Sequence, residues 1–120
     1  MKRIIILFCF MLVGLSAEAQ KKKSSTKLSI EVDGVCMMCK KRIEKAALQT
    51  KGVKFASWDV KTHQLSLIVD PNKTNTNIIQ NNIANVGHDT KGIRAKDHVY
   101  NSNPACCKYR DKKVVEAHKN

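Results

Sequence analysis

Residues 28–53 read LSIEVDGVCMMCKKRIEKAALQTKGV, and the hydrophobic period changes in the middle of this stretch. Leu28, Ile30 and Val32 alternate with polar residues, which is typical of a half-buried strand. From the first cysteine onward the period is three or four residues, as on one face of a helix. That face consists of Cys39, Ile43, Ala46, Ala47 and Thr50. Gly52 stands where a helix C-terminal cap belongs. The stretch therefore predicts a strand followed directly by a helix, with two thiols where they meet.

The chain continues with two further strands and a second helix. Residues 53–59 and 64–69 have the composition and length of strands, with a short connection between them. For the helix, Thr74 and Asn75 are the candidate N-caps, and Gly87 marks the end. Its apolar stripe consists of Ile79, Ile83 and Val86. These elements complete most of a small two-layer domain.

A weaker strand pattern at residues 90–94 gives the order β-α-β-β-α-β over residues 26–96. This order is that of a ferredoxin-like sandwich, in which an antiparallel sheet carries two helices on one face. The predicted fold class is therefore α+β. Residues 20–25 form a linker before this domain, and residues 97–120 form a C-terminal extension.

Residues 1–19 have the pattern of a secretory signal peptide. Lys2 and Arg3 precede an apolar run, and an A-x-A cleavage site ends at Ala19. The apolar run is shorter than the roughly 20 residues needed to span a bilayer. We therefore expect a periplasmic or secreted protein without stable membrane insertion after cleavage.

The chain is strongly basic, with a formal net charge of +12. Such a charge can indicate nucleic-acid binding. The predicted export argues against this function, and so does an aromatic content of only 5%, since single-stranded bases stack on aromatic side chains. We predict no nucleic-acid partner and a solvated basic surface.

Cys36 and Cys39 have the spacing of either a soft-metal chelate or a redox pair. Thiolates select Cu(I), Hg(II), Cd(II) or Zn(II) over hard cations. The helix N-terminus should favour the thiolate form, as should the neighbouring Lys40, Lys41 and Arg42. Two thiolates on a flexible loop suit the near-linear coordination of Cu(I) or Hg(II), whereas a structural zinc site takes four ligands.

The segment Gly34-Val35-Cys36-Met37-Met38-Cys39, with Gly52-Val53 at the end of the helix, resembles the heavy-metal-associated domain family. That family includes small copper chaperones, periplasmic mercuric-ion binding proteins and the metal-binding modules of soft-metal P-type ATPases. The resemblance extends from Thr26 to about Lys96. The family usually has Gly-Met-x-Cys, whereas this chain is one residue shorter and lacks the Met. We expect Val35 to fill the space under the loop.

Together with the signal-peptide pattern, the resemblance implies an exported metal-binding protein that holds its ion on Cys36 and Cys39. Cu(I) is the expected ion, with Hg(II), Zn(II) and Cd(II) as alternatives. The protein would act as a carrier, chaperone or scavenger by thiolate ligand exchange, as a monomer. Its partner would be a metal-transporting membrane ATPase or another thiol-bearing acceptor. No bond is made in a substrate, so we expect no enzyme.

Two other hypotheses remain open for the thiol pair. One is a thiol-disulfide redox protein that uses the same C-x-x-C pair. Against it, a thioredoxin-like fold needs a cis-proline facing the pair, and Pro71 and Pro104 lie in a turn and in the extension. The other is a structural module with a disulfide between Cys36 and Cys39.

Three further residues are candidate metal ligands. His88 follows Gly87, where the family often carries Gly-Tyr facing the metal loop; the alternative is a histidine on a surface loop. Cys106 and Cys107 could be additional ligands, a second relay site or disulfide partners. We place the metal role first. Tyr100 and Tyr109 should anchor the extension by packing, and Met37 and Met38 should form an apolar collar around the site rather than ligate.

Overall fold

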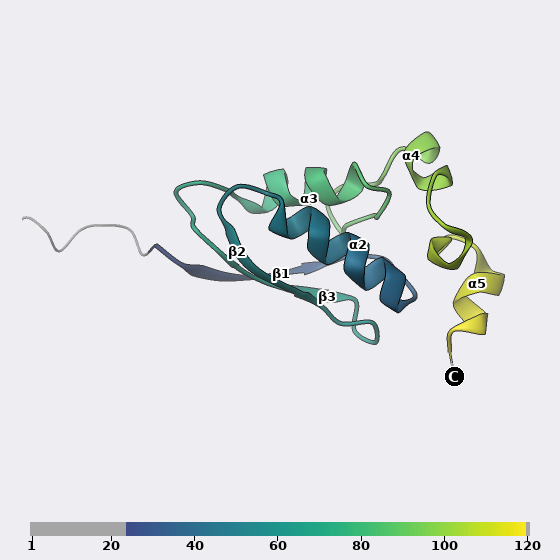
Figure 1. Ribbon diagram of the computed structural model, residues 1–120. Helices are drawn as coiled ribbons and strands as arrows, with labels where there is room; N and C mark the ends of the chain where they lie inside the picture. Colours follow the sequence, from purple (N-terminus) through teal and green to yellow (C-terminus); the bar gives the residue numbers. More distant parts are fainter. Residues whose placement is uncertain (1–23, 120) are drawn as a thin grey trace, which may run out of the picture.

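The computed structural model of the chain describes residues 24–119 (Figure 1). The predicted signal peptide and most of the predicted linker lie outside these residues. The elements are β1 (Thr26–Glu31), α2 (Met37–Leu48), β2 (Val53–Trp58), β3 (Gln64–Val69), α3 (Thr76–Ala84), α4 (Asp97–Asn101), the 3-10 turn η1 (Ala105–Cys107) and α5 (Lys112–Ala117). Within the described part, no helix has the length and apolar character needed to cross a membrane.

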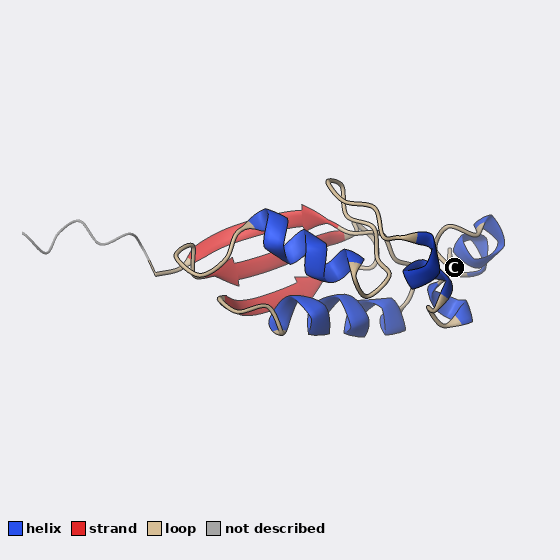
Figure 2. Ribbon diagram, turned by 90° about the horizontal axis from the view of Figure 1, so that it is seen from above, coloured by secondary structure: helices blue, strands red, loops and turns tan. Residues whose placement is uncertain are grey.

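The sheet has β3 at its centre, with β1 and β2 antiparallel on either side. The register places Leu65 opposite both Ile30 and Trp58. Helices α2 and α3 lie side by side on one face of this sheet (Figures 1 and 2). The ferredoxin-like α+β class that the sequence predicts is confirmed.

The core forms between the sheet and the two helices. The helix face predicted from the three- and four-residue period is buried at every position, from Cys39 to Thr50. The sheet contributes Trp58, whose indole Nε1–H donates to the Val32 carbonyl at 3.0 Å, so that its polar atom is satisfied inside the core. The other inward side chains are Ile30, Leu65, Leu67, Val69, Ile79 and Ile83. Asn75 is the N-cap of α3, with its side chain accepting from the Ile78 amide.

The last predicted strand, at residues 90–94, does not form. A single antiparallel bridge between Val32 and Thr90 is all that the described residues contain of it. The Thr90 amide donates to the Ile93 carbonyl at 2.9 Å, and the Thr90 hydroxyl accepts from the Ile93 amide. The Lys91 amide still donates to the Glu31 carbonyl of β1 at 3.1 Å, but Thr90 and Ile93 bond to each other and close a turn, so the pairing with β1 ends after one bridge. Arg110 of the extension donates a hydrogen bond from Nη2 to the Ala95 carbonyl at 2.8 Å.

The extension packs against one end of the sandwich, beside the N-terminus of α2 (Figure 1). Tyr100 and Tyr109 are both buried and meet edge to face, with ring centroids 5.1 Å apart. The Arg110 guanidinium lies over the Tyr100 ring at 4.1 Å. The predicted anchoring by these tyrosines is confirmed, and it fixes where the second pair of cysteines lies.

Candidate metal centre

The first turn of α2 positions the first two thiols. Cys36 is the N-cap and is half-buried, whereas Cys39 is fully buried one turn later. Their Sγ atoms lie 3.4 Å apart. Gly34 allows this close packing, because a Cβ at that position would come within 3.0 Å of Cys39 Cβ and of the Trp58 ring. Val35 packs against the core, as predicted, and its amide donates to Cys39 Sγ at 3.5 Å.

The two thiols differ in acidity. Burial opposes ionisation of Cys36, but the amides of Cys39 and Met38 and the neighbouring thiols more than offset it, so its pKa lies below the usual range. At Cys39 burial prevails and the pKa is raised. The basic neighbours Lys40, Lys41 and Arg42 were expected to lower the thiol pKa, but none of them is among the causes of the shift at Cys36. Lys40 binds Glu44 at 2.7 Å, and Arg42 binds the Val86 carbonyl at 2.7 Å. The helix N-terminal amides therefore favour the Cys36 thiolate.

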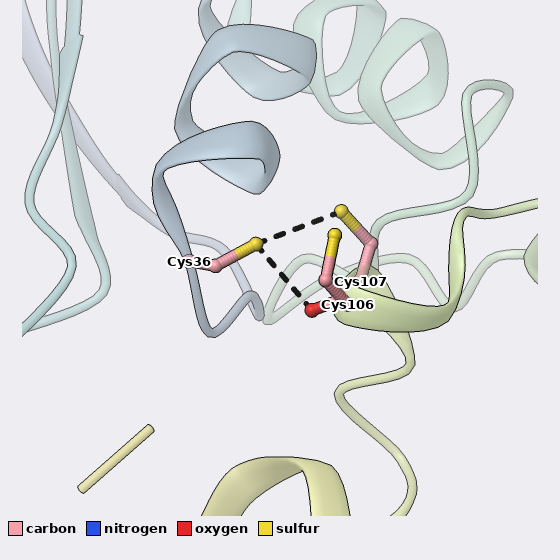
Figure 3. A group of neighbouring side chains, drawn as sticks. All are labelled: Cys36, Cys106 and Cys107. Atoms are coloured by element: carbon pink, nitrogen blue, oxygen red, sulfur yellow. Dashed lines mark hydrogen bonds between the residues drawn. The ribbon is translucent and has the colours of Figure 1, made fainter. Parts of the chain in front are cut away.

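The extension brings Cys106 and Cys107 to this pair. Figure 3 shows Cys36 and the two adjacent cysteines facing one another between α2 and η1. Cys107 Sγ is fully buried and lies 3.9 Å from Cys36 Sγ. Cys36 Sγ also lies 3.4 Å from the Cys106 carbonyl oxygen, and Cys106 Sγ lies 3.6 Å from Met38 Sδ. Burial raises the pKa of Cys107, and its contacts with Cys39 and Cys36 raise it further.

His88 is fully buried beside the thiols, so the alternative of a histidine on a surface loop is wrong. Its Nδ1 lies 2.8 Å from the Asp33 carbonyl oxygen. Because a carbonyl only accepts, Nδ1 carries the hydrogen and Nε2 has a free lone pair. Nε2 is buried and has no hydrogen-bond partner within the described part of the chain. Burial lowers the pKa of His88 to about 4, which keeps the ring neutral at pH 7.

The five candidate ligands form two overlapping groups. The ligand atoms of Cys39, His88 and Cys107 lie within 4.8 Å of one another, and so do those of Cys36, Cys106 and Cys107. Cys107 belongs to both groups. The four cysteines in the described residues are free thiols, so the disulfides considered above are not formed. Met37 and Met38 are largely exposed at the rim, as expected of an apolar collar.

Apart from Tyr109, the residues that hold the extension against the site are not indicated by the sequence. Asn103 Nδ2 donates to the Gly87 carbonyl at 2.8 Å, and the Tyr109 hydroxyl donates to the same oxygen at 2.9 Å. Arg42 of α2 donates to Asn103 Oδ1 at 2.9 Å. Gly87 has a φ of +98°, and a Cβ there would lie 2.4 Å from Asn103 Oδ1. Asparagine and glycine are common in loops, and only the folded chain shows that these two touch.

Asp89 is the second anchor point. Its carboxylate accepts from Arg110 Nη2 and from the Ala95 amide, each at 2.7 Å, and its own amide donates to the Tyr109 hydroxyl at 2.8 Å. Burial would raise the pKa of Asp89, but these bonds prevail and lower it. Residues on both sides of the Cys106-Cys107 pair are therefore bonded to the segment that carries His88.

Known proteins share this domain. The model of the heavy-metal-associated domain matches residues 29–89. A copper-exporting P-type ATPase of Staphylococcus epidermidis is 34% identical over 65 residues, which are 53% of this chain and 8% of that protein. The chain thus spans a small part of the curated relatives it matches.

Solved structures of other proteins have a similar fold. A CopZ metallochaperone is 26% identical, with 54% of this chain and 98% of that chain covered and a TM-score of 0.52. The oxidized MerP from Ralstonia metallidurans CH34 shares the fold at 22% identity and a TM-score of 0.53, over 56% of this chain and 94% of that one. The residues from Thr90 onward, including Cys106 and Cys107, lie beyond the stretch that the family model matches.

Proposed function

The chain belongs to the heavy-metal-associated domain family, and from this membership we propose that it carries or scavenges a soft metal ion. The observation that carries the proposal is the pair of sulfurs 3.4 Å apart at the start of α2. Thiolates bind soft ions in preference to hard ones. Cu(I) is the ion we expect first, since a relative is a copper-exporting ATPase, with Hg(II), Zn(II) and Cd(II) as alternatives.

Transfer would proceed by ligand exchange. Cys36 is half-buried and carries the more acidic of the two thiols, so it is the thiolate that an incoming ion meets first. Cys39 is buried behind it and closes the chelate. An acceptor thiolate would enter the coordination sphere on the side of Cys36 before either sulfur leaves. No substrate bond is made or broken in this sequence, which is the action of a carrier and not of an enzyme.

The acceptor we propose is a metal-transporting membrane ATPase or another thiol-bearing protein, met by a monomer of this chain. Lys41 and Lys45 are exposed on α2, the helix that begins at the thiols. Positive charge near the site would attract an acidic docking surface and speed encounter. Export to the periplasm or the exterior is part of the proposal and follows from the pattern of residues 1–19.

Anaerobic titration tests the proposal. The protein should bind one equivalent of Cu(I) in competition with a Cu(I) chelator, and the Cys36→Ser/Cys39→Ser variant should lose this binding. A Met37→Ser variant is the control, because Met37 is largely exposed at the same loop and is not an expected ligand. Insulin reduction without tight metal binding would contradict the carrier function and support the redox alternative.

A further inference from the structure

We propose that the C-terminal extension completes a four-ligand site for one soft metal ion, formed by Cys36, Cys39, Cys107 and His88. The inference rests on the proposed function and goes beyond it by adding two ligands and a coordination number. The added sulfur comes from a segment beyond the stretch that the family model matches. The protein would therefore enclose its ion instead of presenting it on two thiolates at the surface.

The distances between the sulfurs suit a small polyhedron. Cys36 Sγ lies 3.4 Å from Cys39 Sγ and 3.9 Å from Cys107 Sγ, and Cys39 and Cys107 lie within 4.8 Å. For metal–sulfur bonds of about 2.3 Å, two sulfurs on a tetrahedral ion are about 3.8 Å apart, whereas a linear pair is about 4.6 Å apart. The two measured separations lie nearer the tetrahedral value. Three sulfurs at such spacing can face one ion together.

His88 supplies the fourth ligand. Its Nε2 is buried, has a free lone pair and lacks a partner in the described residues, which is a costly state for a polar atom. A ring nitrogen of His88 lies within 4.8 Å of the Cys39 and Cys107 sulfurs. The bond from Nδ1 to the Asp33 carbonyl is the kind of contact that orients metal-binding histidines. A metal ion would satisfy Nε2.

Cys107 is held in place from both sides. Asn103, which precedes Cys107 in the chain, donates to the Gly87 carbonyl. Tyr109, which follows Cys107, is bonded to Gly87 and Asp89. The Tyr109 ring also stacks on His88, with centroids 5.4 Å apart. The position of the Cys107 thiol is thus fixed by a network of contacts that also includes His88.

Cys106 lies outside the inner set. It is half-buried and faces Met38 at the rim, 3.6 Å from Sδ, whereas Cys107 is fully buried among the ligands. The two residues are adjacent and chemically identical. Cys106→Ser is therefore a closely matched control for Cys107→Ser.

The experiment is X-ray absorption spectroscopy on the full protein loaded anaerobically with one equivalent of Cd(II). We expect three sulfur neighbours and one nitrogen. Cys107→Ser should lose one sulfur, and Cys106→Ser should keep all three. His88→Phe, which retains a ring against Tyr109, should keep three sulfurs and lose the nitrogen. Circular dichroism checks that each variant is folded.

Two sulfurs in the unmodified protein would overturn the inference, as would loss of a sulfur in Cys106→Ser but not in Cys107→Ser. If His88→Phe does not fold, the sulfur counts of the other variants still decide the part of Cys107. Failure of the proposed function looks different. In that case the unmodified protein would not retain the ion, or the Cys36→Ser/Cys39→Ser variant would bind it equally well.

Discussion

His88 shows how a single side chain links the site to stability. Its ring is neutral because burial depresses the pKa to about 4, while an unfolded chain gives histidine its usual value near 6.5. Between these values the unfolded state binds more protons than the folded state. Acidification through this window therefore favours unfolding, and the metal-free protein should weaken well above the pH at which carboxylates titrate.

We expect the free energy of unfolding of the metal-free protein to fall by up to about 3 kcal/mol between pH 7 and pH 4 on account of His88. Urea titrations followed by the fluorescence of the buried Trp58 would measure this change. His88→Phe should remove most of the dependence in this window. An equal pH dependence in that variant would show that His88 is not the group responsible.

At the scale of elements, the connection after α3 is the critical one. Residues 86–89 leave the helix, turn at Gly87 and receive the extension through Asn103 and Tyr109. The extension in turn contributes Cys107 to the hydrophobic core. Domain and extension are therefore joined by specific polar bonds around a small backbone segment, and not by a broad apolar interface alone.

Gly87→Ala should destabilise the protein by about 1–3 kcal/mol, since it combines a left-handed backbone with a Cβ 2.4 Å from Asn103 Oδ1. It should also release the extension, so that limited proteolysis cleaves residues 97–119 sooner. Gly92→Ala is the matched control, because its Cβ meets only the end of the flexible Gln80 side chain and no left-handed backbone is involved. Equal protease sensitivity of the two variants would contradict the role of Gly87.

At the scale of the whole molecule, the sandwich and the extension make separate contributions. Nearly all of the core cluster comes from residues 30–83, and Cys107 is its one fully included member from the extension. Removing the extension exposes His88 and Asp89 and takes away two buried tyrosines. The domain should therefore keep its fold and lose part of its stability.

A chain shortened to end at Lys96 should unfold cooperatively with a far-ultraviolet spectrum of mixed helix and sheet, but with a free energy of unfolding lower by about 3 kcal/mol or more. This loss corresponds to the burial of the two tyrosine rings, since burying a large side chain stabilises a protein by about 1.5–3 kcal/mol. Thermal unfolding monitored by circular dichroism would test it. An unfolded shortened chain would show that the extension is required for the fold itself.

Local periodicity was enough to predict the sandwich. The buried face of α2 and the alternation along β1 were predicted from a few residues each, because packing there follows a period that one element sets by itself. The prediction of a strand at residues 90–94 was wrong, because Thr90 and Ile93 bond to each other and close a turn. The contact of Arg42 with Asn103 joins residues 61 positions apart and has no period, so it could be seen only in three dimensions.

The docking of the extension also has a consequence for protein engineering. Asn103, Tyr109 and Arg110 make the polar contacts of the extension with the domain. Their partners there are Arg42, Gly87, Asp89 and the Ala95 carbonyl. We therefore expect that the segment from Lys96 to Arg110 can be grafted onto another domain of this fold. Grafted onto another sandwich of this kind that offers a glycine, an acidic residue and an arginine at these positions, it would convert an open two-thiol loop into an enclosed compartment.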